Sequence, residues 1–99
     1  DLGEEPQARM MAANRQLGQV DVVKVAHHGS ADQNPRLYDK LGATVGIISV
    51  GVDNSYGHPT DKLLAMLVHA GTRAERTDRG GMILVAPRPD GSLSVWTEK

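Results

Sequence analysis

Residues 20–30 read VDVVKVAHHGS, and this stretch decides the fold. Its first seven residues, 20–26, are dense in β-branched side chains and bounded by residues that favour turns, a pattern typical of a short buried strand. The strand ends directly on the sequence HHGS. We therefore expect a buried strand whose carboxyl end carries polar side chains.

Helical segments are expected on both sides of this strand. Before it, residues 4–17 predict a helix, because acidic residues and a proline favour the first turn and Gly18 provides a stop. After it, Asn34 and Pro35 are typical of a cap and a first helical position, and they open a short helix that Gly42 closes. Helix and strand thus alternate from the start of the chain.

A second strand and a longer helix are expected next. Residues 44–50 (TVGIISV) predict a second buried strand, and residues 52–59 (VDNSYGHP) predict a loop. Thr60 caps the following helix and Gly71 ends it. The apolar face that this helix is expected to bury in the core consists of Leu63, Leu64, Leu67 and Val68.

The C-terminal part of the chain is predicted to be β-structure. Strands are expected at residues 73–77, 82–86 and 92–97, with Asp90 and Gly91 in the turn of a closing hairpin. Alternating strands and helices imply a layered sheet, to which the final strands would add an edge. The fold class predicted from these patterns is α/β.

The composition limits the possible classes of protein. The chain has 99 residues, a formal net charge of −1, no cysteine and no phenylalanine, and its aromatic residues are Tyr38, Tyr56 and Trp96. The lack of cysteine excludes disulfides and zinc–thiolate sites, and the charge lacks the basic excess typical of tight duplex binding. No apolar run reaches the roughly 20 residues of a membrane helix. Because aromatic side chains usually dominate a core, we interpret residues 1–99 as one partial domain.

Polar residues gather in the segments that follow the two predicted buried strands. His27 and His28 follow the first strand, and Asn54, Tyr56 and His58 lie in the loop after the second. In open α/β sheets ligands bind beyond the carboxyl ends of the strands, so these residues predict a functional edge. Adjacent residues of an extended strand point to opposite sides, so one of the paired histidines is expected to face away from the other. Histidine is the commonest metal ligand and the usual acid–base residue near neutral pH.

Other polar residues are better explained by structural roles. His69 lies late in a helix, where a cation interacts favourably with the helix dipole. Ser30 is expected to cap a turn, since no Gly-x-Ser-x-Gly motif surrounds it. Arg73, Arg76 and Arg79 form a basic cluster that could meet phosphates, but the acids interleaved with them favour a solvated face.

Four stretches of the sequence resemble, in order and spacing, the C-terminal part of the metallo-β-lactamase-like domain of ComEC-type competence proteins. They are DLGEEPQARM, DVVKVAHHGS, IISVGVDNSYGHP and RTDRGGMILV. The HHGS and YGHP blocks carry most of this resemblance. It implies a layered metallo-β-lactamase-like (αββα) fold, of which residues 1–99 would be the C-terminal half.

The resemblance also implies a metal site. Asp1 matches an aspartate that bridges two metal ions in this superfamily. His27 or His28 matches the histidine that completes the second metal site, and His27 is favoured. Zinc and manganese are both compatible with histidine and aspartate ligands.

The same resemblance implies which residues lie at the rim of this site and which metal ligands the chain lacks. Asn54, Tyr56 and His58 match a polar loop at the rim of the active site, where substrate contacts or a proton donor are expected. The His-x-His-x-Asp-His cluster that supplies most ligands in this superfamily is absent from the sequence. The chain alone is therefore expected to bind metal weakly or not at all and to be inactive, because typical catalytic centres use three or four protein ligands.

For the intact protein the resemblance implies a metal-dependent hydrolase, a phosphodiesterase or nuclease, that degrades the DNA strand not transported during uptake. The expected partners are single-stranded DNA and the rest of the same polypeptide, including a membrane channel. The chain would then be a soluble domain of a bacterial inner-membrane protein. Apolar surface left uncovered by the other half would make the isolated chain self-associate.

Two other functions are compatible with the same residues. A hydrolase of the same fold could act on esters, lactones or small phosphodiesters, because nothing in these residues distinguishes DNA from such substrates. A non-enzymatic α/β module, with incidental histidines or a decayed metal site, is the third hypothesis. Only the resemblance favours the nuclease.

Overall fold

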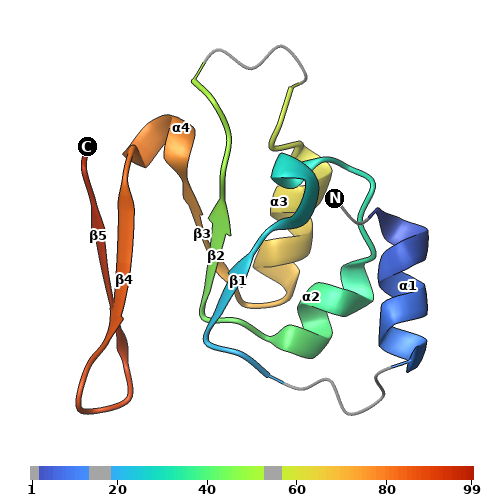
Figure 1. The fold of residues 1–99 in the computed structure, drawn as a ribbon, viewed down its shortest axis with the longest axis horizontal. Helices are drawn as coiled ribbons and strands as arrows, with labels where there is room; N and C mark the ends of the chain where they lie inside the picture. The colour runs from blue at the N-terminus through green and yellow to red at the C-terminus, as the bar shows by residue number, and fades with distance from the viewer. Residues whose placement is uncertain (1–2, 14–18, 53–56) are drawn as a thin grey trace.

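A computed structural model of the chain describes residues 3–13, 19–52 and 57–99. Helices and strands alternate over most of its length, which confirms the predicted α/β class (Figure 1). In chain order the elements are α1 (Glu4–Ala13), β1 (Val22–Lys24), the 3₁₀ turn η1 (Ala26–Gly29), α2 (Pro35–Leu41), β2 (Val45–Ile48), α3 (Asp61–His69), β3 (Arg73–Arg76), α4 (Thr77–Gly80), β4 (Ile83–Pro87) and β5 (Leu93–Thr97).

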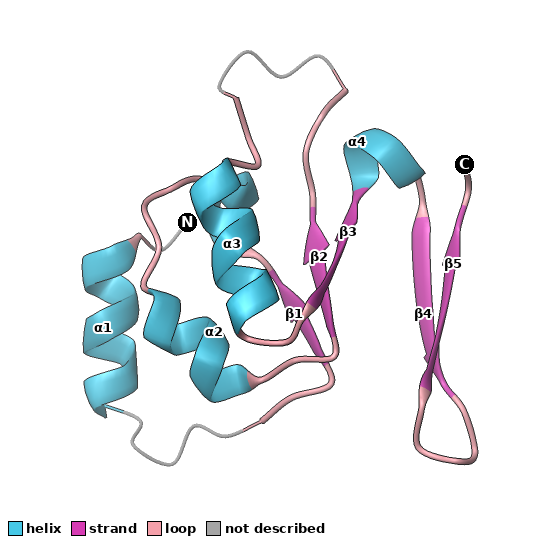
Figure 2. Ribbon diagram, turned by 180° about the vertical axis from the view of Figure 1, so that it is seen from behind, coloured by secondary structure: helices cyan, strands magenta, loops and turns pink. Residues whose placement is uncertain are grey.

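A parallel sheet organises the fold. Within the described ranges its strand order is β1-β2-β3, and Val23, Gly46 and Ala74 lie side by side in its register. Figures 1 and 2 show α1, α2 and α3 on one side of this sheet and the β4–β5 hairpin on the other. Because all of the strands in the sheet are parallel, their carboxyl ends meet at one edge.

The core lies between the parallel sheet and the helices. Val25 and Ile48 contribute to it from the sheet side, and Leu63, Met66 and Leu67 from α3. The prediction that Val68 belongs to this face is wrong, because the residue is 78% exposed. Met66 takes its place, since helical positions three and four residues apart share a face.

The helix boundaries follow the capping residues that the sequence contains. Asn34 accepts a hydrogen bond from the Arg36 backbone at the start of α2, and Thr60 accepts one from the Leu63 backbone at the start of α3. Gly42 closes α2 in a left-handed conformation. These predicted caps are confirmed. The predicted start of α1 is confirmed as well, whereas the predicted stop at Gly18 lies outside the described residues.

The first predicted strand differs from expectation in length and burial. Of residues 20–26 only Val22–Lys24 form a strand, and Ala26 already begins the 3₁₀ turn η1. Val22 and Lys24 are exposed, so the prediction of a buried strand is wrong. The reason is that β1 lies at one end of the strand order and pairs with β2 alone in the described sheet.

The C-terminal strands also differ from the prediction. The strand expected at residues 73–77 ends at Arg76, because Thr77–Gly80 forms the short helix α4. The last two strands do not extend the parallel sheet in the described structure but pair with each other as an antiparallel hairpin. The predicted turn of this hairpin is confirmed, with a hydrogen bond of 3.0 Å from the Gly91 N–H to the Arg88 carbonyl.

A buried network of polar side chains joins α1 and α2 to the turn η1. Gln33 accepts hydrogen bonds at Oε1 from Gln7 Nε2 (2.7 Å) and from the Tyr38 hydroxyl (2.8 Å). Its Nε2 donates to the Ala26 carbonyl at 2.7 Å. Gln7, Gln33 and Tyr38 are at most 2% exposed. Because unpaired buried polar groups are costly, this network fixes the position of the backbone at the start of η1.

The phenol of Tyr38 makes the stability of the fold sensitive to alkaline pH. Burial raises the pKa of Tyr38 above its ordinary value of 10.0, although the N–H of Ala26 acts in the opposite direction. The unfolded chain therefore loses this proton at lower pH than the folded chain, and stability falls as the pH rises above about 10. Urea unfolding across this range is expected to show the loss. In Tyr38→Phe the decline should be shallower, and equal slopes in the two proteins would contradict the assignment.

Candidate functional site

The carboxyl edge of the parallel sheet carries the candidate functional site. The turn η1 follows β1, the segment from Ser49 to Thr60 follows β2, and α4 follows β3. All of these connections leave the same edge of the sheet, where ligands bind in open α/β folds. The edge predicted from the sequence is therefore formed in the structure.

His28 is held at this edge by a backbone carbonyl. Its Nδ1 lies 2.7 Å from the carbonyl oxygen of Ser49, directly after β2. Because a carbonyl can only accept, Nδ1 carries the proton, and in the neutral ring the lone pair is on Nε2. A metal-binding histidine is commonly oriented in this way, by donating its other ring N–H to a carbonyl.

Gly29 brings the HHGS turn into contact with the segment after β2. Its carbonyl accepts a hydrogen bond of 2.9 Å from the Thr60 N–H. A Cβ atom at this position would lie 2.6 Å from Cβ of Pro59, so a side chain does not fit between the two segments. The backbone also has a positive φ of 81°, which favours glycine. This contact places His28 and His58, from segments far apart in the sequence, at the same edge.

Thr77 ties the end of β2 to the start of α4. Its hydroxyl accepts a hydrogen bond from the Val50 N–H and donates one to the Val50 carbonyl, both at 2.8 Å. A short helix was not expected here, and the RTDRGG sequence contains no signal for a contact with residue 50. Thr77 is therefore a positioning residue for the segment that follows β2.

Arg76 and Asp78 form a bidentate ion pair beside Thr77. Arg76 Nε and Nη2 donate to the two carboxylate oxygens of Asp78 at 3.0 and 2.7 Å. This contact with Arg76 is the main reason that the pKa of Asp78 lies below its usual value. Both side chains are largely buried, with 19% and 12% of their surface exposed. The pair joins the last residue of β3 to α4 at the same edge.

Ser30 does not have the structural role expected from the sequence. Its hydroxyl is buried and has no hydrogen-bond partner in the described part of the chain. The prediction that it caps a turn is therefore wrong. His69, by contrast, lies far from the edge in the last turn of α3, where its Nδ1 is 3.1 Å from a carboxylate oxygen of Asp39.

Only some of the residues predicted to form the site lie in the part of the chain that the structure describes. His28 and His58 lie at the carboxyl edge. The backbone of His27 belongs to η1, but its side chain lies outside the described residues. The remaining predicted residues, Asp1, Asn54 and Tyr56, lie entirely outside the described residues. That one of the paired histidines binds metal therefore stays a prediction, as does the choice between them.

Sequence reasoning missed the residues that position this edge. Gln7 and Gln33 are 26 positions apart, and no periodic pattern indicates that their amides meet. The contact between Thr77 and Val50 is equally long-range. Such pairs are determined by how the helices and strands pack, which local sequence patterns do not encode.

Comparison with known proteins relates the chain to a segment of a longer protein. It is similar to ComE operon protein 3 of Bacillus subtilis (strain 168), with 36% identity over 84 residues. The aligned region covers 84% of this chain and 11% of that protein. No family model and no solved structure matches the chain. In the part of the chain that the structure describes, every helix falls short of the length and apolarity that crossing a membrane requires.

Proposed function

We propose that the chain is part of a hydrolase domain that cleaves DNA phosphodiesters during DNA uptake. Similarity to ComE operon protein 3 supports the link to competence. The observation that carries the proposal is the hydrogen bond from His28 Nδ1 to the Ser49 carbonyl, at the carboxyl edge of the parallel sheet. It holds a histidine in the orientation and tautomer of a metal ligand, at the position where α/β sheets bind substrates.

The metallo-β-lactamase-like fold is part of the same proposal. Parallel sheets are normally covered on both faces, and α1, α2 and α3 lie on one side of this sheet (Figure 2). In the β4–β5 hairpin the cross-strand pair Leu84 and Trp96 is 56% and 51% exposed. The second half of an αββα domain would cover such surfaces. Without it, these apolar side chains would cause self-association.

The metal of this domain would need ligands in addition to those that the structure describes. Among residues 3–13, 19–52 and 57–99, no group of three or more acidic, histidine or cysteine side chains could hold a metal ion. His28 would supply one nitrogen, and Asp1 and His27 remain proposed ligands. Zinc or manganese would therefore be held jointly with the rest of a longer polypeptide, which is also the proposed partner, with its membrane channel. We assign no catalytic step to the chain alone.

The chain would contribute substrate contacts at the rim of that domain. Asn54, Tyr56 and His58 are proposed to contact the DNA strand or to donate a proton, because all of them follow β2 in the sequence and His58 lies at the carboxyl edge. Gly29 and Thr77 would position this segment through their contacts with Thr60 and Val50.

The proposal is tested by metal-dependent cleavage of single-stranded DNA by the longer protein. Of the variants His28→Ala and His27→Ala, the one that removes the ligand is expected to lower the cleavage rate by about 100-fold or more. Losing a hydrogen bond that supports a metal ligand already lowers metal affinity or activity by about 10- to 100-fold, and losing the ligand itself should cost at least as much. His69→Ala is the matched control, because His69 is exposed at the far end of α3. Unchanged activity in both variants would exclude these histidines, and absence of cleavage with either metal would exclude the nuclease.

A further inference from the structure

The basic residues of β3 and α4 are not equally neutralised. Arg73 forms an ion pair with Glu75 at 2.7 Å, and Arg76 uses both carboxylate oxygens of Asp78. Arg79 is exposed, and among the described residues it makes no hydrogen bond or ion pair, although its charge attracts the Asp78 carboxylate more weakly than Arg76 does. The interleaved acids, which on sequence grounds favoured a solvated face, are thus engaged by the other two arginines.

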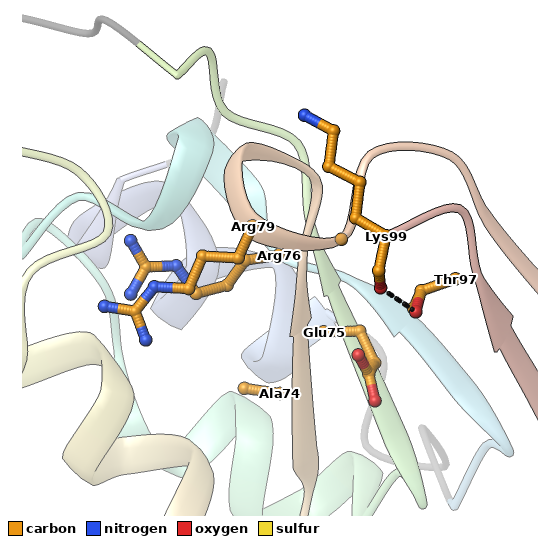
Figure 3. Close-up of a pocket in the computed structure, with 7 residues that line it drawn as sticks. Ala74, Glu75, Arg76, Arg79, Thr97 and Lys99 are labelled. Carbon is orange, nitrogen blue, oxygen red and sulfur yellow. Dashed lines mark hydrogen bonds between the residues drawn. The ribbon is translucent and has the colours of Figure 1, made fainter.

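Arg79 lies beside a second guanidinium that is already fixed in place. Arg76 and Arg79 line the same surface hollow of about 280 Å³ between β3, α4 and β5. Figure 3 shows both side chains extending to the side of β3 on which α3 lies, away from Thr97 in β5, so the hollow shows that the two residues are neighbours but does not hold their guanidinium groups. Asp78 neutralises one of the two arginine charges, so one positive charge remains on this side of the strand.

The position of this charge connects it with the candidate site. α4 follows β3 directly, so Arg79 lies at the same carboxyl edge as His28 and His58. The hydrogen bonds between Thr77 and Val50 attach α4 to the segment that contains His58. Gly80 and Gly81, which follow Arg79, pack closely against Thr97 and Glu98, so the side chains of these two residues are on the hairpin side of α4. Guanidinium groups bind phosphate oxygens through paired N–H donors.

We propose that Arg79 binds a backbone phosphate of single-stranded nucleic acid at this edge, next to the guanidinium of Arg76. The inference rests on the proposed function, since it names the substrate contact of the same site. It does not depend on metal or on cleavage. The net charge of −1 is compatible with it, because one local cation supports weak binding of a single strand rather than tight binding of a duplex.

The test measures binding of a fluorescein-labelled oligothymidylate to the 99-residue chain in EDTA, by fluorescence anisotropy over a range of salt concentrations. Arg79→Gln is expected to weaken binding about three- to tenfold at low salt and to flatten the slope of log K against log salt by about 0.7, the value for one lost phosphate contact with a single strand. Arg73→Gln is the matched control, because it removes the same charge from the amino end of β3. It should leave the slope unchanged.

Several outcomes would overturn the phosphate site. The first is that the wild-type chain does not bind the oligonucleotide. The second is that Arg79→Gln and Arg73→Gln lose equal oligonucleotide affinity. The third is that inorganic phosphate shifts the Arg79 side-chain NMR signals at lower concentration than the oligonucleotide does. The last result would assign the site to free phosphate. Binding retained in a longer protein that does not cleave DNA would reject only the hydrolase.

Discussion

Replacing Gln33 by alanine is expected to lower the free energy of unfolding by about 3 kcal/mol or more, because it removes a hydrogen-bond partner from several buried groups at once. Gln33 is 1% exposed and bonds to Gln7, to the Tyr38 hydroxyl and to the Ala26 carbonyl. A buried polar group that loses its partner costs about 1–3 kcal/mol. Urea denaturation followed by circular dichroism measures the change.

Two variants separate the lost hydrogen bonds from other causes. Gln33→Met keeps most of the side-chain volume but none of the hydrogen bonds, so it should be nearly as unstable as Gln33→Ala. Gln19→Ala removes an exposed amide and should change the stability by no more than about 0.5 kcal/mol. If Gln33→Met retained wild-type stability, the network would contribute packing alone.

The Gln33 network also links the fold to the candidate site. Gln33 and Tyr38 bond to the carbonyl and the N–H of Ala26, the first residue of η1. His27 and His28 follow immediately, so the backbone from which they extend is fixed by α1 and α2. The ring of His28 is then oriented by the Ser49 carbonyl. The position of the histidine turn is therefore a property of the helical layer as much as of the sheet.

Local chemistry made part of this fold predictable. Asn34 and Thr60 are at their predicted caps because their side chains accept hydrogen bonds from backbone N–H groups a few residues later. The Asp90–Gly91 turn is similarly local, since the Asp90 carboxylate accepts the Ser92 N–H. Where neighbouring residues decide the conformation, the sequence alone predicts it correctly.

The remaining features depend on packing between distant segments. Val22 resembles a buried strand residue but lies on an edge strand, and its neighbour in space is known only once the strand order is known. Val68 belongs to an apolar run, yet the sheet contacts the helix face that contains Met66 instead. Likewise, the HHGS sequence predicted a functional edge, but the Ser49 carbonyl that orients His28 is 21 residues away.

Gly29→Ala is expected to lower the free energy of unfolding by about 2–4 kcal/mol, combining about 1 kcal/mol for a left-handed backbone with the cost of a steric collision. The added methyl group would lie 2.6 Å from Cβ and 3.0 Å from Cα of Pro59. Since backbone is involved, the segment after β2 must move. We therefore also expect the imidazole NMR signals of His28 and His58 to shift together.

Gly71→Ala separates these two causes. Gly71 has a similar φ of 76°, but a Cβ atom there would meet no atom within 4 Å. This variant should lose only about 1 kcal/mol and leave both histidine signals in place. Equal losses in the two variants would mean that backbone conformation alone requires Gly29. A larger loss confined to Gly29→Ala, with both histidines displaced, would show that contact between the HHGS turn and Pro59 builds the edge at which we propose that DNA binds.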